Sequence, residues 1–178
     1  MALKPLRVRY SKIAATVQEL LDRHGVSGPC VPVQAIARGE GLDVKQGDLG
    51  QVSGMLVRGT AGATIGVNSK HAPTRRRFTI AHELGHFLLH EGLLSHVDKD
   101  FRVNYRDDES SLATNIEEIE ANTFAASLLM PEPFLQALNA EDAVDDDSRV
   151  AELAAEFDVS RHAMSLRLIN LYGRYKPF

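Results

Sequence analysis

The sequence is poor in cysteine, and Cys30 is the single one among its 178 residues. An internal disulfide is therefore excluded, and a chain without disulfides fits a reducing, cytoplasmic location. The N-terminus carries basic residues but no continuous apolar stretch, so we expect no signal peptide. Because no apolar run approaches about 18 residues, we also expect no membrane span.

The sequence also lacks an excess of positive charge. Lys and Arg total 20 against 24 Asp and Glu, which gives a net charge of −4. Proteins that bind nucleic acid through the field of the whole molecule are basic, so this balance argues against direct nucleic-acid binding. With 44% hydrophobic and 25% charged residues, the composition is instead typical of a globular domain.

Hydrophobic spacing and the positions of glycine and proline distinguish three regions. Helices are expected in residues 1–41, a small antiparallel sheet followed by two long helices in 42–130, and further helices in 131–178. The length fits a single domain, residues 1–178, that contains all three regions. We therefore expect an α+β fold in which a small sheet packs among helices.

The strands of this sheet are expected at residues 42–46, 53–59 and 62–68, where β-branched residues lie between glycines. An outer strand within residues 52–68 could pair with an extended segment of a partner. The residues from 93 to 112 are expected to form a polar loop, with a candidate strand at FRVNY.

The segment His-Glu-Leu-Gly-His lies in a long predicted helix. At about 100° per residue, His82, Glu83, His86 and His90 fall within about 100° of the helix circumference. Histidines four residues apart can present their nitrogens to one ion, for which we expect zinc, with manganese as the alternative. Glu83 is then placed as the general base that takes a proton from water and passes it to a leaving amine.

A third ligand would distinguish a metal site from a helix whose histidines only satisfy buried polar contacts. The metzincin spacing is absent, because Gly92 stands where its third histidine would be. The predicted helix over residues 114–130 offers Glu118 at the margin of its apolar stripe. Glu120, expected on the polar side of the same helix, is the alternative.

Three further residues are candidates for supporting roles. His90 faces the same way as His86 and could orient a ligand or stabilise an oxyanion. Asn122 lies close to Glu118 on the predicted helix wheel. Tyr105 could reach the site from the polar loop as an oxyanion donor.

The segments RRFTIAHELGHFLLH (76–90) and EIEANTFAASLLMP (118–131) together resemble the ImmA/IrrE family of metallopeptidases. The resemblance extends over residues 33–171 and implies a compact, gluzincin-like zinc peptidase fold. By this resemblance, two histidines and one glutamate hold zinc, and a second glutamate is the catalytic base. These residues correspond here to His82, His86, Glu118 and Glu83, respectively.

Known members of this family cleave helix-turn-helix repressors and so switch on genes of mobile elements or stress responses. The resemblance therefore implies a repressor as the protein substrate. Two other functions stay open at this point. The chain could be an anti-repressor that holds metal without cleaving, or it could bind DNA through the helix-turn-helix-like pair in residues 153–168, with Arg161 and Arg167 pointing outward.

Overall fold

The computed structural model describes residues 6–60, 62–90, 95–98 and 109–173. Its elements, in chain order, are α1 (Tyr10–Arg23), α2 (Val33–Gly39), β1 (Leu42–Gly47), β2 (Gly54–Gly59), β3 (Gly62–Asn68), α3 (Pro73–Leu89), β4 (Ser95–Asp98), α4 (Glu109–Leu129), α5 (Glu132–Ala137), the 3-10 helix η1 (Ala140–Ala143), α6 (Asp147–Glu156) and α7 (Arg161–Tyr172). The expected α+β architecture is confirmed. Within the described ranges, the helices are all too short or too polar to cross a membrane.

The sheet has the strand order β1-β3-β2-β4. Strand β2 pairs antiparallel with both β3 and β4, as expected for a hairpin and its neighbour. Strand β1, however, pairs with β3 in parallel. The expectation of a purely antiparallel sheet was therefore wrong for β1, and the sheet is mixed.

The parallel pairing depends on the connection between β1 and β2, residues 48–53. Asn68, at the end of β3, is buried, and its side-chain amide donates to the carbonyls of Gly50 and Val52 at 3.1 and 2.8 Å. These bonds hold the connection across the end of β3. As a result, β2 lies on the far side of β3 from β1, and β1 runs in the same direction as β3.

The pairing also shows which strands are at the edges. Strands β2 and β3 each have a neighbour on both sides, so the expected outer strand within residues 52–68 was wrong. Among the described strands, the two edges are β1 and β4.

The expected polar loop after α3 is also partly wrong. Residues 95–98 form β4, which pairs with β2, and α4 already begins at Glu109 rather than near residue 114. A strand of four residues is too short to show a clear alternation of hydrophobic and polar residues, so the sequence did not predict it. Its pairing with β2 stabilises the strand. The candidate strand at 101–105 lies outside the described residues.

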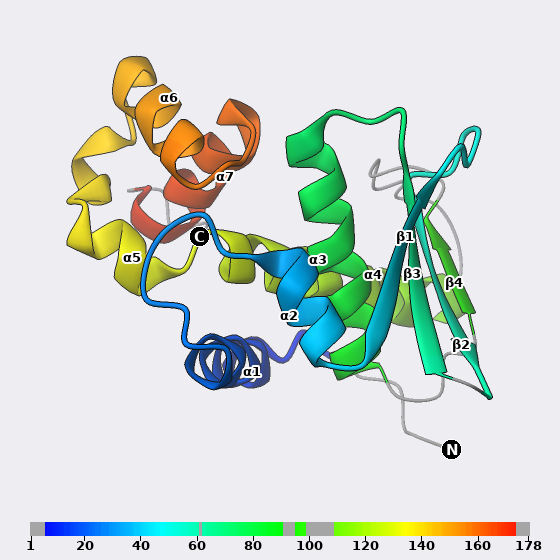
Figure 1. The fold of residues 1–178 in the computed structure, drawn as a ribbon. Helices are drawn as coiled ribbons and strands as arrows, with labels where there is room; N and C mark the ends of the chain where they lie inside the picture. Colours follow the sequence, from blue (N-terminus) through cyan, green and yellow to red (C-terminus); the bar gives the residue numbers. More distant parts are fainter. Residues whose placement is uncertain (1–5, 61, 91–94, 99–108, 174–178) are drawn as a thin grey trace.

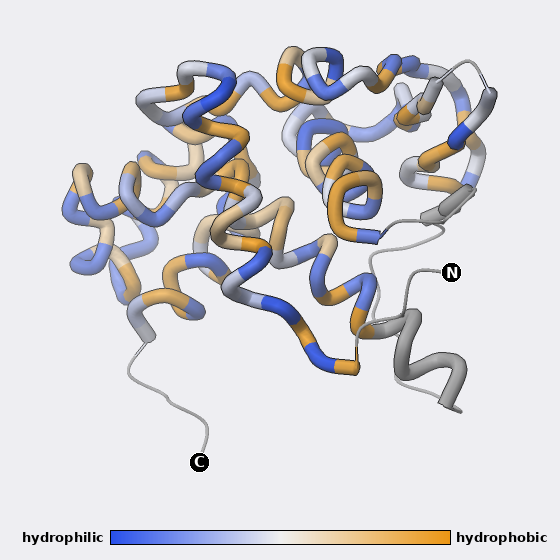
Figure 2. Tube along the Cα trace, turned by 90° about the horizontal axis from the view of Figure 1, so that it is seen from below, coloured by the Kyte–Doolittle hydropathy of each residue, from blue (hydrophilic) through white to orange (hydrophobic). Residues whose placement is uncertain are grey.

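Helices cover one face of this sheet (Figure 1). Helix α3 lies next to β2 and β3, and α4 crosses behind it, while α1 packs against α4. Buried side chains such as Leu56 and Ile65 from the sheet and Ile80 and Leu84 from α3 belong to one hydrophobic core. Figure 2 shows hydrophobic and hydrophilic residues alternating along the helices, as amphipathic helices require. This packing encloses the polar residues of α3 between the sheet and α4.

Candidate metal centre

Helix α3 carries two histidines one turn apart on a buried side. The exposed fraction is 1% for His82 and 0% for His86. Their Nε2 atoms lie 3.0 Å from each other, so both rings point into the same space. This is the arrangement that a spacing of four residues on a helix predicts.

Glu118 reaches this space from α4. Its Oε1 lies 3.2 Å from Nε2 of His86, and its Oε2 lies 3.4 Å from Nε2 of His82. The Glu118 side chain is 31% exposed, whereas the two histidines are buried. One donor atom from each of the three residues lies within 4.8 Å of the others. The structure thus brings together the three residues expected as ligands.

The two helices approach closely because small residues line their contact. A Cβ atom at Gly85 would lie 2.9 Å from Cδ1 of Phe124 and 3.3 Å from Cα of Ala121. Gly85 is the residue before His86, and Ala121 is one turn beyond Glu118. A larger residue at Gly85 would separate α3 from α4 and move the carboxylate of Glu118 away from the histidines.

Asn122 orients His82. The Nδ1 atom of His82 lies 3.0 Å from Oδ1 of Asn122, one turn along α4 from Glu118. An amide oxygen only accepts hydrogen bonds, so Nδ1 carries the proton in this arrangement. In the neutral ring, Nε2 of His82 then presents a lone pair toward Glu118. This contact is the one through which Asn122 could play the supporting role expected of it.

The donor set fits a divalent cation. Two ligands bound to zinc at about 2.0–2.1 Å in tetrahedral geometry lie about 3.4 Å apart. The two Nε2 atoms lie 3.0 Å apart, Oε1 of Glu118 lies 3.2 Å from Nε2 of His86, and the other carboxylate oxygen, Oε2, lies 3.4 Å from Nε2 of His82. Two imidazoles and one carboxylate are also a known ligand set of catalytic zinc, which keeps a further position open for water or substrate.

Glu83 lies beside this group but is not part of it. Its side chain is fully buried, and its Oε1 lies 3.4 Å from the point where a Cβ atom of Gly54 on β2 would stand. The closest atom to that point is Cγ2 of Thr79, so the absence of a side chain at Gly54 lets α3 lie close to β2. Among the described residues, the group that could hold an ion consists of His82, His86 and Glu118.

Glu120, the alternative ligand, has a different environment from the one expected. It is 0% exposed instead of lying on the polar side of α4. Its Oε1 accepts from Nε of Arg9 at 2.9 Å and its Oε2 from Nη2 of Arg9 at 2.6 Å. Burial alone would raise the pKa of Glu120, but the bonds from Arg9 and His90 outweigh it and lower the pKa to about 2. Glu120 is therefore an ionised, buried partner of Arg9.

His90 lies between Glu120 and His86. Its Nε2 lies 3.0 Å from Oε2 of Glu120, and its Nδ1 lies 3.0 Å from Nδ1 of His86. Burial lowers the pKa of His90 and outweighs the opposing effect of Glu120. Of the two roles expected for His90, this geometry favours orientation of His86. Tyr105, the other expected oxyanion donor, lies outside the described residues.

Arg9 was missed by sequence reasoning. It precedes α1 and is 111 positions away from Glu120, its principal partner. No local motif marks it. The predicted position of Glu120 gave no signal either, because a carboxylate on the polar side of a helix needs no cationic partner, whereas the buried Glu120 does.

The helix pair α6 and α7 differs from the expected DNA-binding surface. Arg161 is exposed as expected, but Nε of Arg167 donates to the carbonyl of Met130 at 3.2 Å, and burial lowers the pKa of Arg167. The outward position expected for Arg167 was therefore wrong. The exposed side of α7 instead carries Leu166 and Ile169.

Comparisons with known proteins show the family of this chain. The family model of Peptidase_M78, the IrrE N-terminal-like domain, matches residues 37–168. The radiation response metalloprotease IrrE of Deinococcus radiodurans is 34% identical over 96 residues, which are 53% of this chain and 27% of that protein. The uncharacterized immunity region protein 2 of Bacillus phage phi105 is 28% identical over 151 residues, 83% of this chain and 87% of that protein.

A solved structure, a transcriptional regulator of Mycobacterium tuberculosis, shares the fold with a TM-score of 0.63 at 16% identity. The similarity covers 89% of this chain and 46% of the regulator, so the chain spans less than half of that protein. It likewise spans about a quarter of the length of IrrE. The family match covers most of the sequence and includes both the helix with the two histidines and the helix with Glu118. The chain therefore belongs to the ImmA/IrrE family of metallopeptidases.

Proposed function

We propose that this protein is a zinc-dependent endopeptidase that cleaves a helix-turn-helix repressor in the cytoplasm and so derepresses mobile-element or stress-response genes. The observation that carries the proposal is the convergence of His82, His86 and Glu118, with donor atoms within 4.8 Å of one another, beside the buried Glu83. The family to which the chain belongs supports peptide hydrolysis as the reaction.

His82, His86 and Glu118 would hold the ion. Two imidazole nitrogens and one carboxylate oxygen favour zinc, whereas manganese prefers sites richer in oxygen ligands and is the alternative. When bound, zinc would polarise the scissile carbonyl and make a water molecule more acidic. The partly exposed side of Glu118 is the direction from which an extended peptide would enter.

Glu83 would move the proton. Its carboxylate accepts a proton from the attacking water while the hydroxyl oxygen adds to the carbonyl carbon of the scissile peptide. The same carboxyl group then donates this proton to the amide nitrogen as the carbon–nitrogen bond breaks. The adjacent positions of Glu83 and His82 on α3, together with the burial of Glu83, support this role.

A repressor as substrate is supported by the family and by one relative. Known family members cleave helix-turn-helix repressors, and the phage phi105 relative carries the name of an immunity region protein. That relative matches this chain over nearly its whole length, 87% of its residues. A shared substrate class is therefore a reasonable proposal, while the particular repressor must be found by capture.

The experiment uses Glu83→Gln as a trap. The variant would be used to capture a partner from the native host, and zinc-loaded wild-type protein would then be added while the intact mass of the partner is followed. The expected result is a repressor cut at one peptide bond, with the cut blocked by a chelator. Glu152→Gln, the same change at an exposed residue of α6, is the matched control and should cleave during capture.

A different outcome would support a different function. If the captured partner is a repressor that zinc-loaded wild-type protein holds but leaves intact, the chain is an anti-repressor that acts by binding. The proposed peptidase activity would then be wrong, although the metal site could still be present.

A further inference from the structure

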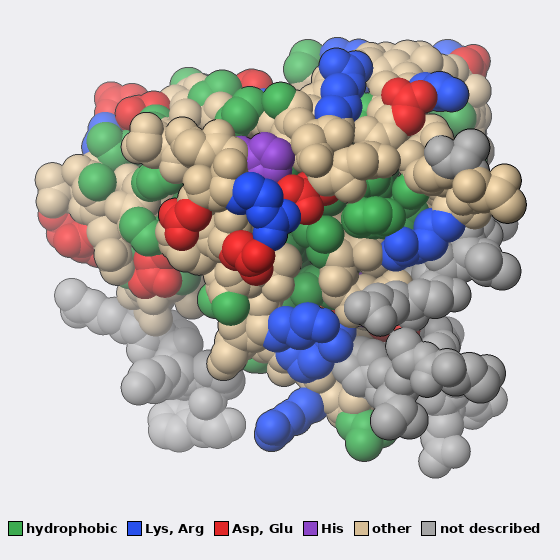
Figure 3. Space-filling view, turned by 60° about the horizontal axis from the view of Figure 1, so that its bottom comes forward, with side chains coloured by type: hydrophobic (Ala, Val, Ile, Leu, Met, Phe, Trp, Pro, Cys, Tyr) green, Lys and Arg blue, Asp and Glu red, His purple; other side chains and the backbone are tan. Residues whose placement is uncertain are grey.

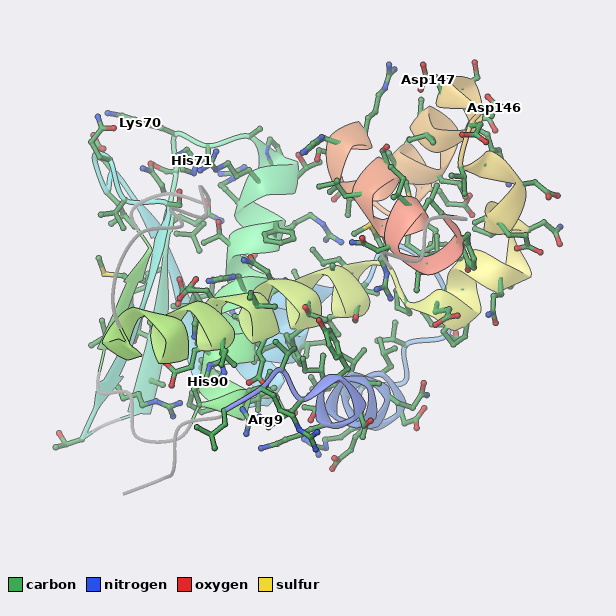
Figure 4. The ribbon with its side chains drawn as sticks, turned by 180° about the vertical axis from the view of Figure 1, so that it is seen from behind. Arg9, Lys70, His71, His90, Asp146 and Asp147 are labelled. Carbon is green, nitrogen blue, oxygen red and sulfur yellow. The ribbon has the colours of Figure 1, made fainter. Side chains whose placement is uncertain are left out.

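Buried polar groups form a continuous chain from His86 to the N-terminal segment. His86 contacts His90, His90 contacts Glu120, and Glu120 contacts Arg9, each through side-chain atoms 2.6 to 3.0 Å apart. Figure 4 labels Arg9, just before α1, and His90, just after α3. Both side chains contact the carboxylate of Glu120 on α4. Three elements distant in sequence thus converge behind one of the ligand histidines.

The hydrogen bonds in this chain can run in one direction only. Both oxygens of Glu120 already accept from N–H groups of Arg9, so the carboxylate is an acceptor and Nε2 of His90 donates to it. The neutral ring of His90 then has a lone pair on Nδ1, which can only accept from Nδ1–H of His86. The proton of neutral His86 is thereby placed on Nδ1, and its Nε2 is left as a lone pair that faces Glu118.

Arg9 fixes the position of the Glu120 carboxylate, which is the acceptor for His90. Its backbone N–H and its Nε both donate to Oε1 of Glu120, at 2.7 and 2.9 Å, and Nη2 donates to Oε2 at 2.6 Å. The same Nη2 also donates to the carbonyl of Leu89 at 3.1 Å, in the last turn of α3. Arg9 therefore holds the carboxylate and the end of the helix that carries His86 in one position.

We propose that Arg9, Glu120 and His90 are positioning residues that fix His86 in its Nδ1–H tautomer, with Nε2 presented to a cation. This inference rests on the proposed metal site and adds the residues that prepare one of its ligands. Outer partners that orient a ligand histidine typically change metal affinity by about 10–100-fold when they are removed.

The first test compares two substitutions of His90. An asparagine places its Oδ1 close to the position of Nδ1 of His90, so His90→Asn should still accept from His86 without help from Glu120. His90→Phe cannot accept. ¹⁵N NMR of the zinc-free full-length protein should show His86 as the Nδ1–H tautomer in wild type and in His90→Asn, and as a mixture in His90→Phe. The zinc affinity, measured by competition with a chelator, should fall about 10–100-fold in His90→Phe alone.

The second test asks whether Glu120 acts through His90. Glu120→Gln can both donate and accept, so it no longer fixes the proton of His90. In the wild-type background it should give mixed tautomers of His86 and weaker zinc binding. In the His90→Asn background it should change neither. A purely structural role of Glu120 would instead reduce zinc affinity to the same extent in both backgrounds, and that result would overturn the proposal.

Arg58 provides a control for the end of α3. Its Nη2 donates to the backbone carbonyls of Phe87 and His90 at 2.8 and 3.4 Å, so it holds the same end of α3 through backbone atoms and not through the side chain of His90. Arg58→Met should lower stability and leave the tautomer of His86 unchanged, whereas Arg9→Met should change the tautomer. Equal effects of the two variants on the tautomer would contradict the proposal. If wild-type protein fails to bind zinc at all, the proposed function fails, yet the NMR result still decides the role of these residues.

Discussion

Glu118 and Glu120 lie close together on α4 and differ in what surrounds them. Glu118 is partly exposed and faces the Nε2 atoms of two histidines. Glu120 is fully buried and bonded by the guanidinium of Arg9. Their chemistry follows from these neighbours, since a carboxylate that already accepts from three N–H groups of Arg9 and from His90 has little to offer a metal ion. Glu118 is therefore the candidate metal ligand, and Glu120 is the buried partner of Arg9.

Substitutions at His82 and Glu83 should separate metal binding from catalysis. His82→Ala removes one donor, so it should lose bound zinc and peptide cleavage together. Glu83→Gln leaves the three donors in place, so it should keep one zinc per chain while the cleavage rate falls about 10²–10⁴-fold. Elemental analysis and the rate of repressor cleavage measure the two effects. A Glu83→Gln variant that cuts as fast as wild type would refute the assignment of the base.

The sequence predicted the residues that meet at this centre but not the environment of Glu120. The two histidines share a helix, so their spacing is enough to place them together. The choice between Glu118 and Glu120 needed a helix wheel, and the wheel placed Glu120 in solvent. That placement was wrong because Arg9, which compensates the buried charge, comes from the other end of the chain.

At the scale of elements, the site depends on how closely α3 and α4 pack. Gly85 and Ala121 form the point of closest approach, directly beside His86 and one turn from Glu118. The mixed sheet supplies the other wall, where Gly54 lets β2 lie close to Thr79 of α3. The sequence indicated these helices and strands but not the parallel partner of β1, because strand pairing is set by the connection at Asn68 and not by the pattern within β1.

Gly85→Val should separate the two helices. The added side chain would overlap Phe124 in the core, so the free energy of unfolding should fall by about 1–3 kcal/mol, and zinc binding should weaken as Glu118 moves. Urea denaturation and chelator competition measure the two effects. Gly28→Val is the control, because no atom lies within 4 Å of a Cβ at Gly28. Unchanged zinc affinity in Gly85→Val would show that the helix contact does not set the position of Glu118.

Asn68→Ala should weaken the connection that places β2 on the far side of β3. It removes the donors that bind the carbonyls of Gly50 and Val52, so about 1–3 kcal/mol of stability should be lost. The exposed Asn170 on α7 is the control, and Asn170→Ala should change stability very little. Hydrogen exchange should show faster exchange in residues 48–53 of Asn68→Ala, and unchanged exchange there would contradict this role.

At the scale of the whole molecule, charge is distributed and nearly balanced. The net charge is −4, and acidic and basic side chains are interspersed on the face shown in Figure 3. Electrostatic effects are therefore expected from particular pairs and not from a field over the whole surface. One such pair joins α1 to the end of α2, where Glu40 bonds with Arg23 and His24 at 2.8 and 2.9 Å.

This contact should make stability depend on pH in the acid range. Burial would raise the pKa of Glu40, but bonds from His24 and Arg23 outweigh it and lower the pKa below its ordinary 4.5. Ionised Glu40 thus stabilises the fold above about pH 4.5, and this stabilisation is lost as pH falls through the lower folded-state pKa. Urea denaturation should show a deficit for Glu40→Gln at pH 7 that shrinks below about pH 4.5. A deficit that stays constant into strong acid would contradict this origin.

The central claim is that α3 and α4 together hold one catalytic ion. The most direct measurement is anomalous X-ray diffraction at the zinc edge from crystals of the zinc-loaded protein. The account predicts one zinc ion per chain, at about 2.0–2.2 Å from Nε2 of His82, Nε2 of His86 and a carboxylate oxygen of Glu118, with Glu120 still bonded to Arg9. A zinc ion bound by Glu120 in place of Glu118, or the absence of zinc between the two histidines, would contradict the account.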